Sequence, residues 1–119
     1  MHKALALAAL LAAALPTAPA FAINSPAYLV AQCQSALDGM NHIVRKQAVQ
    51  AIKPGTRVSV IPFCIGIGPI DFGNAAGLTK VIGDNPVLAK ALRRAGWRAD
   101  DVTSIRIDGN SVRLYVHTE

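Results

Sequence analysis

The chain has 119 residues, 52% of them apolar, and a formal net charge of +5 at pH 7. Much of the apolar content lies in residues 1–22, and about 46% of the remaining chain is apolar, as in an ordinary globular domain. A chain of this length forms one domain, so a two-domain enzyme, a TIM barrel and a full dinucleotide-binding fold are excluded.

Residues 1–22 have the pattern of a secretion signal. A short basic start precedes an apolar run over residues 4–15, and Ala20-Phe21-Ala22 supplies small residues for cleavage. As a helix this run reaches about 18 Å, against about 30 Å for a bilayer core, which favours a cleaved signal over a membrane anchor. We expect cleavage after Ala22, a single domain over residues 23–119 with no transmembrane span, and a periplasmic or secreted location in a bacterium.

Export decides how the cysteines are interpreted, because an oxidising compartment favours a disulfide. Cys33 and Cys64 are the only cysteines in the chain. A bridge between them closes a loop of about 31 residues and should stabilise the fold by roughly 3 to 4 kcal/mol. Their spacing resembles neither a C-x-x-C redox pair nor a zinc knuckle, so a structural disulfide is favoured over a redox or metal site.

Two helical patterns precede the first strand. The first begins at Ser25-Pro26, a cap followed by a first-turn proline, and places Cys33 on the core-facing side. The second covers residues 41–53 and ends at Pro54-Gly55. Gly39 either ends the first helix or weakens one that continues, and the pattern leaves both open.

A strand and a glycine-rich loop come next. Residues 56–63 are dense in β-branched side chains that alternate with polar ones, and Pro62 favours an edge position or the end of pairing. Residues 65–73 predict a loop or a bulged extension. Its large apolar side chains are Ile65, Ile67, Ile70 and Phe72. If they are exposed they form a patch typical of an interface, and if they are buried they belong to the core.

Two short helices are predicted after this loop. Asp71 or Asn74 is expected to cap the first, which runs to about Ile82. The second opens at Asn85-Pro86, and Gly96 should end it in the left-handed conformation.

The clearest hairpin in the chain joins strands 102–108 and 111–117 through Gly109-Asn110. With a two-residue turn, the opposed apolar-face pairs are Ile107 with Val112, Ile105 with Leu114, and Thr103 with Val116. The other face should be exposed to solvent, and its side chains are Ser104, Arg106, Asp108, Ser111, Arg113, Tyr115 and His117.

These elements predict an α+β fold. It would consist of a small antiparallel sheet of about three strands, including the C-terminal hairpin, with helices packed on one face and one disulfide.

Catalytic and cofactor motifs are weak. The Gly66-x-Gly68 segment lacks the third glycine of a nucleotide loop, and Pro69 removes a backbone donor. Neither His42 nor His117 lies in a recognisable nucleophile motif. We therefore expect no cofactor, no metal and no catalytic residue, although a small periplasmic hydrolase using one of these histidines stays an alternative.

The charge pattern of the hairpin is more informative. Arg106 and Arg113 are expected to lie opposite one another, which is unfavourable unless Asp108 compensates diagonally. One interpretation is a solvated face. The other is a site where Arg106, Arg113, Tyr115 and His117 bind a phosphate or carboxylate, since arginine's forked donors suit such anions.

The resulting functional hypothesis is an exported, non-enzymatic binding module for an anionic envelope polymer or a protein partner. Nucleic acid is disfavoured by the compartment. A structural or self-assembling envelope protein, acting through the apolar loop, is the second alternative to this hypothesis.

Overall fold

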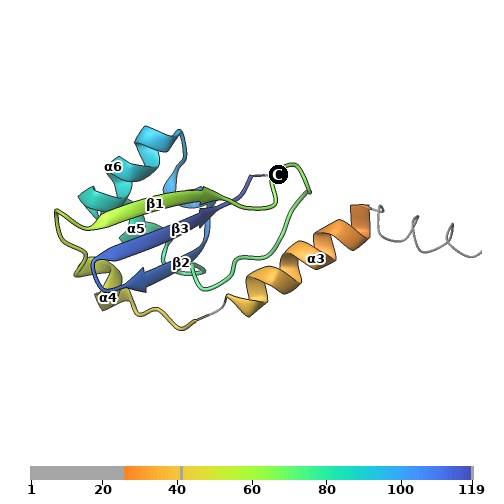
Figure 1. Cartoon of the computed structure of the whole chain (residues 1–119), viewed down its shortest axis with the longest axis horizontal. Coiled ribbons are helices and arrows are strands. Elements are labelled where there is room, and N and C mark those ends of the chain that lie inside the picture. The colour runs from red at the N-terminus through yellow and green to blue at the C-terminus, as the bar shows by residue number, and fades with distance from the viewer. Residues whose placement is uncertain (1–25, 41, 119) are drawn as a thin grey trace, which may run out of the picture.

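The computed structural model describes residues 26–40 and 42–118, so the predicted signal and the cleavage after Ala22 lie outside the described residues. Figure 1 shows a sheet with α5 and α6 behind it and α3 projecting to one side. In chain order the elements are α3 (Pro26–Gly39), α4 (Lys46–Gln50), β1 (Arg57–Pro62), α5 (Thr79–Asp84), α6 (Pro86–Ala95), a 3-10 turn (Ala99–Asp101), β2 (Val102–Asp108) and β3 (Ser111–Val116).

The α+β class, the three strands and the C-terminal hairpin are confirmed, but the sheet is mixed and not antiparallel throughout. Its strand order is β1-β3-β2, with β3 antiparallel to β2 and parallel to β1. Parallel strands need a crossover connection, and the long segment containing α5 and α6 supplies it on one face. Pro62 is the last residue of β1, which is an edge strand as predicted.

The hairpin register is confirmed at two of its three predicted apolar pairs. Ile105 opposes Leu114 and Ile107 opposes Val112. The pairing of Thr103 with Val116 is wrong, because β2 is irregular between Val102 and Ser104 and Thr103 has no partner residue on β3. This bulge turns the Thr103 carbonyl toward the preceding loop, where it accepts a 2.8 Å hydrogen bond from the Gly73 N–H.

The main core lies between the inner face of the sheet and the helices behind it. Its buried members are Val49, Ala75, Leu78, Val81, Ile82, Leu88, Leu92, Val102, Ile105, Val112, Leu114 and Val116. The α6 boundaries follow the prediction: the Asn85 side chain caps its start, and Gly96 ends it at φ 82°.

The predicted helix over residues 41–53 is wrong for most of its length. The first helix ends at Gly39, and only α4, five residues long, is helical within that range. Ile43, counted in the helical stripe, is 94% exposed, whereas Val49 is buried in the main core. The chain before α4 is extended because the His42 carbonyl accepts a 2.8 Å hydrogen bond from Asn74 Nδ2, which holds it beside β2.

The disulfide between Cys33 and Cys64 is confirmed, with 6.1 Å between the Cα atoms. Cys33 does not face the main core, because α3 packs on the loop after β1: the Asp71 N–H donates to Gln34 Oε1 at 2.7 Å. Leu37 is the buried residue of α3, and its side chain closes against the backbone of Gly73, where a Cβ would lie 3.0 Å from it. No helix among the described residues is long and apolar enough to cross a membrane.

Candidate functional site

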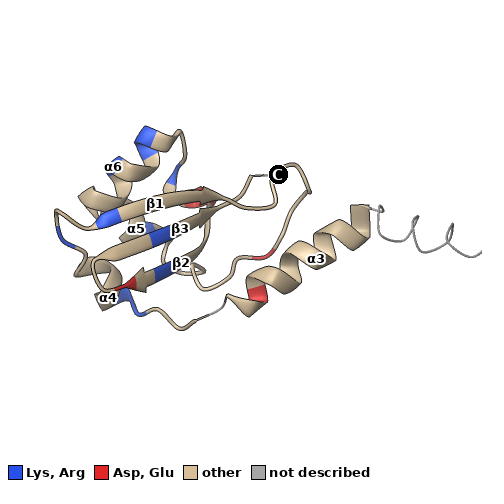
Figure 2. Ribbon diagram, in the orientation of Figure 1, with Lys and Arg blue, Asp and Glu red and all other residues tan. Residues whose placement is uncertain are grey.

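The face of the sheet that points away from α5 and α6 carries mainly polar side chains. Figure 2 shows a basic residue on each of the three strands. The strand registers arrange this face as three rows: Arg57, Ser111 and Asp108; Ser59, Arg113 and Arg106; Ile61, Tyr115 and Ser104. We call the three arginines and Asp108 the arginine face.

The arginine face has more positive than negative charge. Arg106 lies directly opposite Arg113 as predicted, and Arg57 on β1 is diagonal to Arg113. Asp108 is the only carboxylate among the nine side chains of the three rows, and its Oδ2 lies 2.9 Å from Arg106 Nε. Within the described residues, Arg57 and Arg113 have no ion-pair partner, so two exposed guanidinium groups are left uncompensated.

Arg57 was missed by the sequence analysis. The sequence did contain a signal for Arg57, because Arg57 and Ser59 alternate with Val58 and Val60. This alternation places the two polar side chains on one face of the strand and the two valines on the other. What the pattern could not supply was the partner of that strand, and only the parallel pairing of β1 with β3 brings Arg57 next to Arg113.

The hairpin face that the sequence predicts to be exposed to solvent is only partly exposed. Ser104 is buried, and its hydroxyl lies 3.1 Å from Asn74 Oδ1. Tyr115 is half-buried, with its ring edge-on to Phe63 at a centroid distance of 6.5 Å. The loop after β1 therefore covers the row that contains Tyr115, while the two rows with the arginines stay open.

His117 lies apart from the arginine face. It is 8% exposed, and its ring nitrogens lie 2.8 Å from the Phe63 carbonyl oxygen and 2.7 Å from that of Gly68. Carbonyl oxygens only accept hydrogen bonds, so a ring N–H donates to at least one of them and ties the loop to the end of β3. The structure thus brings Arg106, Arg113 and Tyr115 onto one face and directs His117 elsewhere.

Arg106 also borders a groove of about 650 Å³ between β2 and the extended segment before α4. The opposite wall includes His42, which is exposed, and Arg45. Arg113 does not line this groove. The site is therefore concave at its Arg106 end and open over the centre of the sheet.

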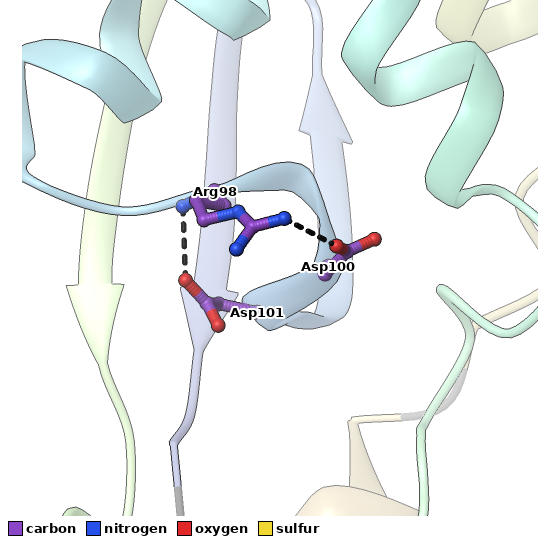
Figure 3. A network of polar contacts seen from close by, with 3 residues as sticks. All are labelled: Arg98, Asp100 and Asp101. Carbon is purple, nitrogen blue, oxygen red and sulfur yellow. Dashed lines mark hydrogen bonds and ion pairs between the residues drawn. The ribbon is translucent and has the colours of Figure 1, made fainter.

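The adjacent carboxylates Asp100 and Asp101 lie in the 3-10 turn before β2. Figure 3 shows Arg98 between them: Asp101 Oδ2 accepts from the Arg98 N–H at 2.9 Å, and Asp100 Oδ2 pairs with the Arg98 guanidinium at 3.1 Å. No cluster of three or more His, Cys, Asp or Glu side chains within residues 26–40 and 42–118 could hold a metal ion.

One ionisable side chain outside this face has a shifted pKa. A hydrogen bond and the charge of Asp84 raise the pKa of Lys80 above its ordinary value, across 2.7 Å between Nζ and Oδ2. Both groups are exposed and lie on α5, behind the sheet, so they take no part in the arginine face.

The apolar loop is divided between exposed and covered side chains. Ile65 is 50% exposed and Phe72 is 49% exposed. Ile67 and Ile70 are half-buried. Of the four large apolar side chains of the loop, the two near the ends of the segment are therefore the exposed ones.

Comparisons with known proteins find no match to a family model, to a curated protein or to a solved structure.

Proposed function

We propose that the protein is a small exported, non-enzymatic binding module whose arginine face takes a phosphate or carboxylate group of an anionic envelope polymer. The observation that supports this proposal is the convergence of Arg57, Arg106 and Arg113 on one open face with Asp108 as their only carboxylate. Like charges directly opposite on neighbouring strands are locally destabilising, and a bound anion would remove that repulsion.

The chemistry of arginine suits such a partner. A guanidinium offers donors in a planar fork that matches the two oxygens of a carboxylate or phosphate, and it stays charged at any working pH. A repeating polymer would meet both the open centre of the face and the groove beside Arg106. The disulfide between Cys33 and Cys64 supports an oxidising location outside the cytoplasm.

The test compares two double variants of the mature chain. R106Q/R113Q removes two charges from the arginine face, and K46Q/R93Q removes two from exposed positions on α4 and α6. On beads carrying polyphosphate or a polyuronic acid, we expect the first variant to lose retention and the second to keep it. Both melting temperatures should stay near that of the parent, because exposed side chains contribute little to stability.

Two further readouts bear on the same proposal. Retention of the parent should fall as salt approaches about 0.15 M, where exposed charges are screened beyond about 8 Å. The two polymers separate a phosphate partner from a carboxylate one. Unchanged retention of R106Q/R113Q would mean that the face is only solvated, and the proposal would fail. A slightly higher melting temperature of this variant is expected in either case, because the two arginines no longer repel one another.

A second candidate function is self-assembly through the loop after β1, favoured by the exposure of Ile65 and Phe72. Sedimentation of the mature protein at high concentration tests it. A concentration-dependent dimer that disappears in I65S/F72S would support assembly, and a strict monomer would exclude it.

A further inference from the structure

The free edge of β1 has unused main-chain hydrogen-bonding groups. The Arg57 N–H donates to the Asn110 carbonyl at 3.0 Å and the Phe63 N–H donates to the Val116 carbonyl at 2.8 Å, so this alternate set of residues bonds toward β3. Along a strand the N–H and C=O groups of successive residues point to opposite sides. Those of Val58 and Val60 therefore point away from the sheet.

No hydrogen bond within the described part of the chain uses these outward-pointing groups. β3 is the only strand that pairs with β1, and the hydrogen bonds of the described residues include none to the backbone of Val58 or Val60 beyond the sheet. Both side chains are half-buried because they pack on the main core from the helix side. The strand is thus held in place by its side chains while its outer edge stays open.

A groove with a basic wall lies beside this edge. It has a volume of about 450 Å³ and runs between the start of β1 and α6. Apolar side chains of Val58, Val87 and Ala91 line it. Lys90 and Arg94, one turn apart on α6, line the same groove and are exposed.

We propose that this groove and edge receive an extended acidic segment of a partner protein, which adds to β1 as a fourth strand. The N–H and C=O groups of Val58 and Val60 would bond to its backbone, in the manner of other strand additions. One of its apolar side chains would enter the groove, and an Asp or Glu two residues along the strand, which points to the same face, would meet Lys90 and Arg94. Pro62 has no N–H, so the added pairing ends there.

Charge favours an acidic partner over a second copy of this chain. Edge-to-edge pairing of two copies would bring together Arg57, Lys90 and Arg94 from each, in a chain that already carries a net charge of +5. Like-charge juxtaposition across an interface is unfavourable and acts against wrong partners. This docking surface is separate from the arginine face, because it uses the backbone edge of β1 and the α6 wall.

The experiment uses the mature protein labelled for NMR and a short capped peptide in which valine and glutamate take turns at every second position, with threonine at the positions between them. Valine and glutamate then point to the same face of the added strand. We expect the amide resonances of Val58 and Val60 to shift on titration and their hydrogen exchange to slow. A peptide N-methylated at the alternate residues that bond to β1 should not bind, while one methylated at the intervening residues should. The same peptide with lysine in place of each glutamate is the charge control.

Protein variants test the basic wall. K90Q/R94Q should weaken binding of the glutamate peptide by about tenfold, as expected for the loss of two exposed ion pairs. K46Q/R93Q removes the same charge away from the groove and should bind normally, as should R106Q/R113Q. The inference is overturned if Val58 and Val60 do not respond up to millimolar peptide, if the lysine peptide binds equally well, or if the shifts map only to the arginine face. A β1-paired dimer that excludes the peptide would also overturn it.

Discussion

At the scale of single residues, the side chain of Asn74 makes backbone hydrogen bonds to β2 that a neighbouring strand would otherwise make. Its Nδ2 donates to the Ile105 carbonyl at 2.7 Å, and its Oδ1 accepts from the Ile105 N–H at 2.7 Å. The sequence predicted a helix cap at Asp71 or Asn74, but α5 begins only at Thr79 and neither residue caps it. An amide side chain supplies both a donor and an acceptor, so Asn74 closes the outer edge of β2 at this point.

We expect Asn74→Ala to lower the free energy of unfolding by about 2 to 4 kcal/mol, because it leaves both backbone groups of Ile105 without partners in a part-buried place. Asn110→Ala is the control, since the only side-chain bond of Asn110 is an exposed 3.4 Å contact to the Gly55 carbonyl. Urea unfolding measures both variants. Equal stability of the two would show that water replaces Asn74 without cost.

A second prediction at the residue scale concerns His117. His117→Ala removes both ring contacts to the carbonyls of Phe63 and Gly68, so the loop should lose its tie to the end of β3. Faster hydrogen exchange confined to residues 63–73, with protection in β3 unchanged, is the expected result. Binding to polyphosphate should be unaffected, because the ring does not face Arg106 or Arg113. If the variant lost binding to polyphosphate, His117 would have to contribute to the anion site after all.

At the scale of elements, Asn85 joins two helices that are separate in the sequence. Its Oδ1 accepts from the N–H of Val87 at 2.9 Å and so caps α6. Its Nδ2 donates to the carbonyl of Val49, in α4, at 3.0 Å and to that of Ile52, just after α4, at 3.2 Å. The capping role could be predicted from the Asn-Pro pair, whereas the link to the end of α4 needed the tertiary structure.

Two substitutions separate the roles of Asn85. Asn85→Ser keeps a capping oxygen but loses the amide donors, and Asn85→Ala loses both. We expect Asn85→Ala to be destabilised more than Asn85→Ser by about 1 kcal/mol, the usual value of a cap. The free energy of unfolding of Asn85→Ser should lie about 1 to 3 kcal/mol below that of the parent, because the carbonyls of Val49 and Ile52 lose their hydrogen-bond donor. Thermal or urea unfolding measures the series, and equal values for the two variants would mean that the cap contributes nothing here.

At the scale of the whole molecule, local signals were predictable and long-range pairing was not. The hairpin and α6 follow from a turn pair, a cap and a left-handed glycine that lie next to the residues they control. The parallel pairing of β1 with β3 depends on a connection that covers residues 63–110 and that no local pattern specifies. The candidate site divides in the same way: the opposition of Arg106 and Arg113 is local to the hairpin, whereas Arg57 joins them only through that pairing.

At the same scale, α3 is attached to the rest of the molecule by contacts outside the main core. All residues of the main core lie outside α3, which is held by the disulfide, by Leu37 against Gly73 and by the Gln34 contact. An isolated helix of 14 residues is marginal in water, so α3 should depend on its cross-link.

We therefore expect reduction, or C33S/C64S, to unfold α3 before the sheet. Hydrogen exchange of residues 26–39 should become fast while the amides of β3 stay protected, and the helical signal in circular dichroism should fall without loss of the cooperative core transition. The loss in stability should then stay below the roughly 3 to 4 kcal/mol that loop closure alone implies, because the reduced protein can release α3 while α4 and β1, which make up much of that loop, stay folded. If the protection of β3 falls together with that of α3, the disulfide stabilises the whole fold and α3 is an integral part of it.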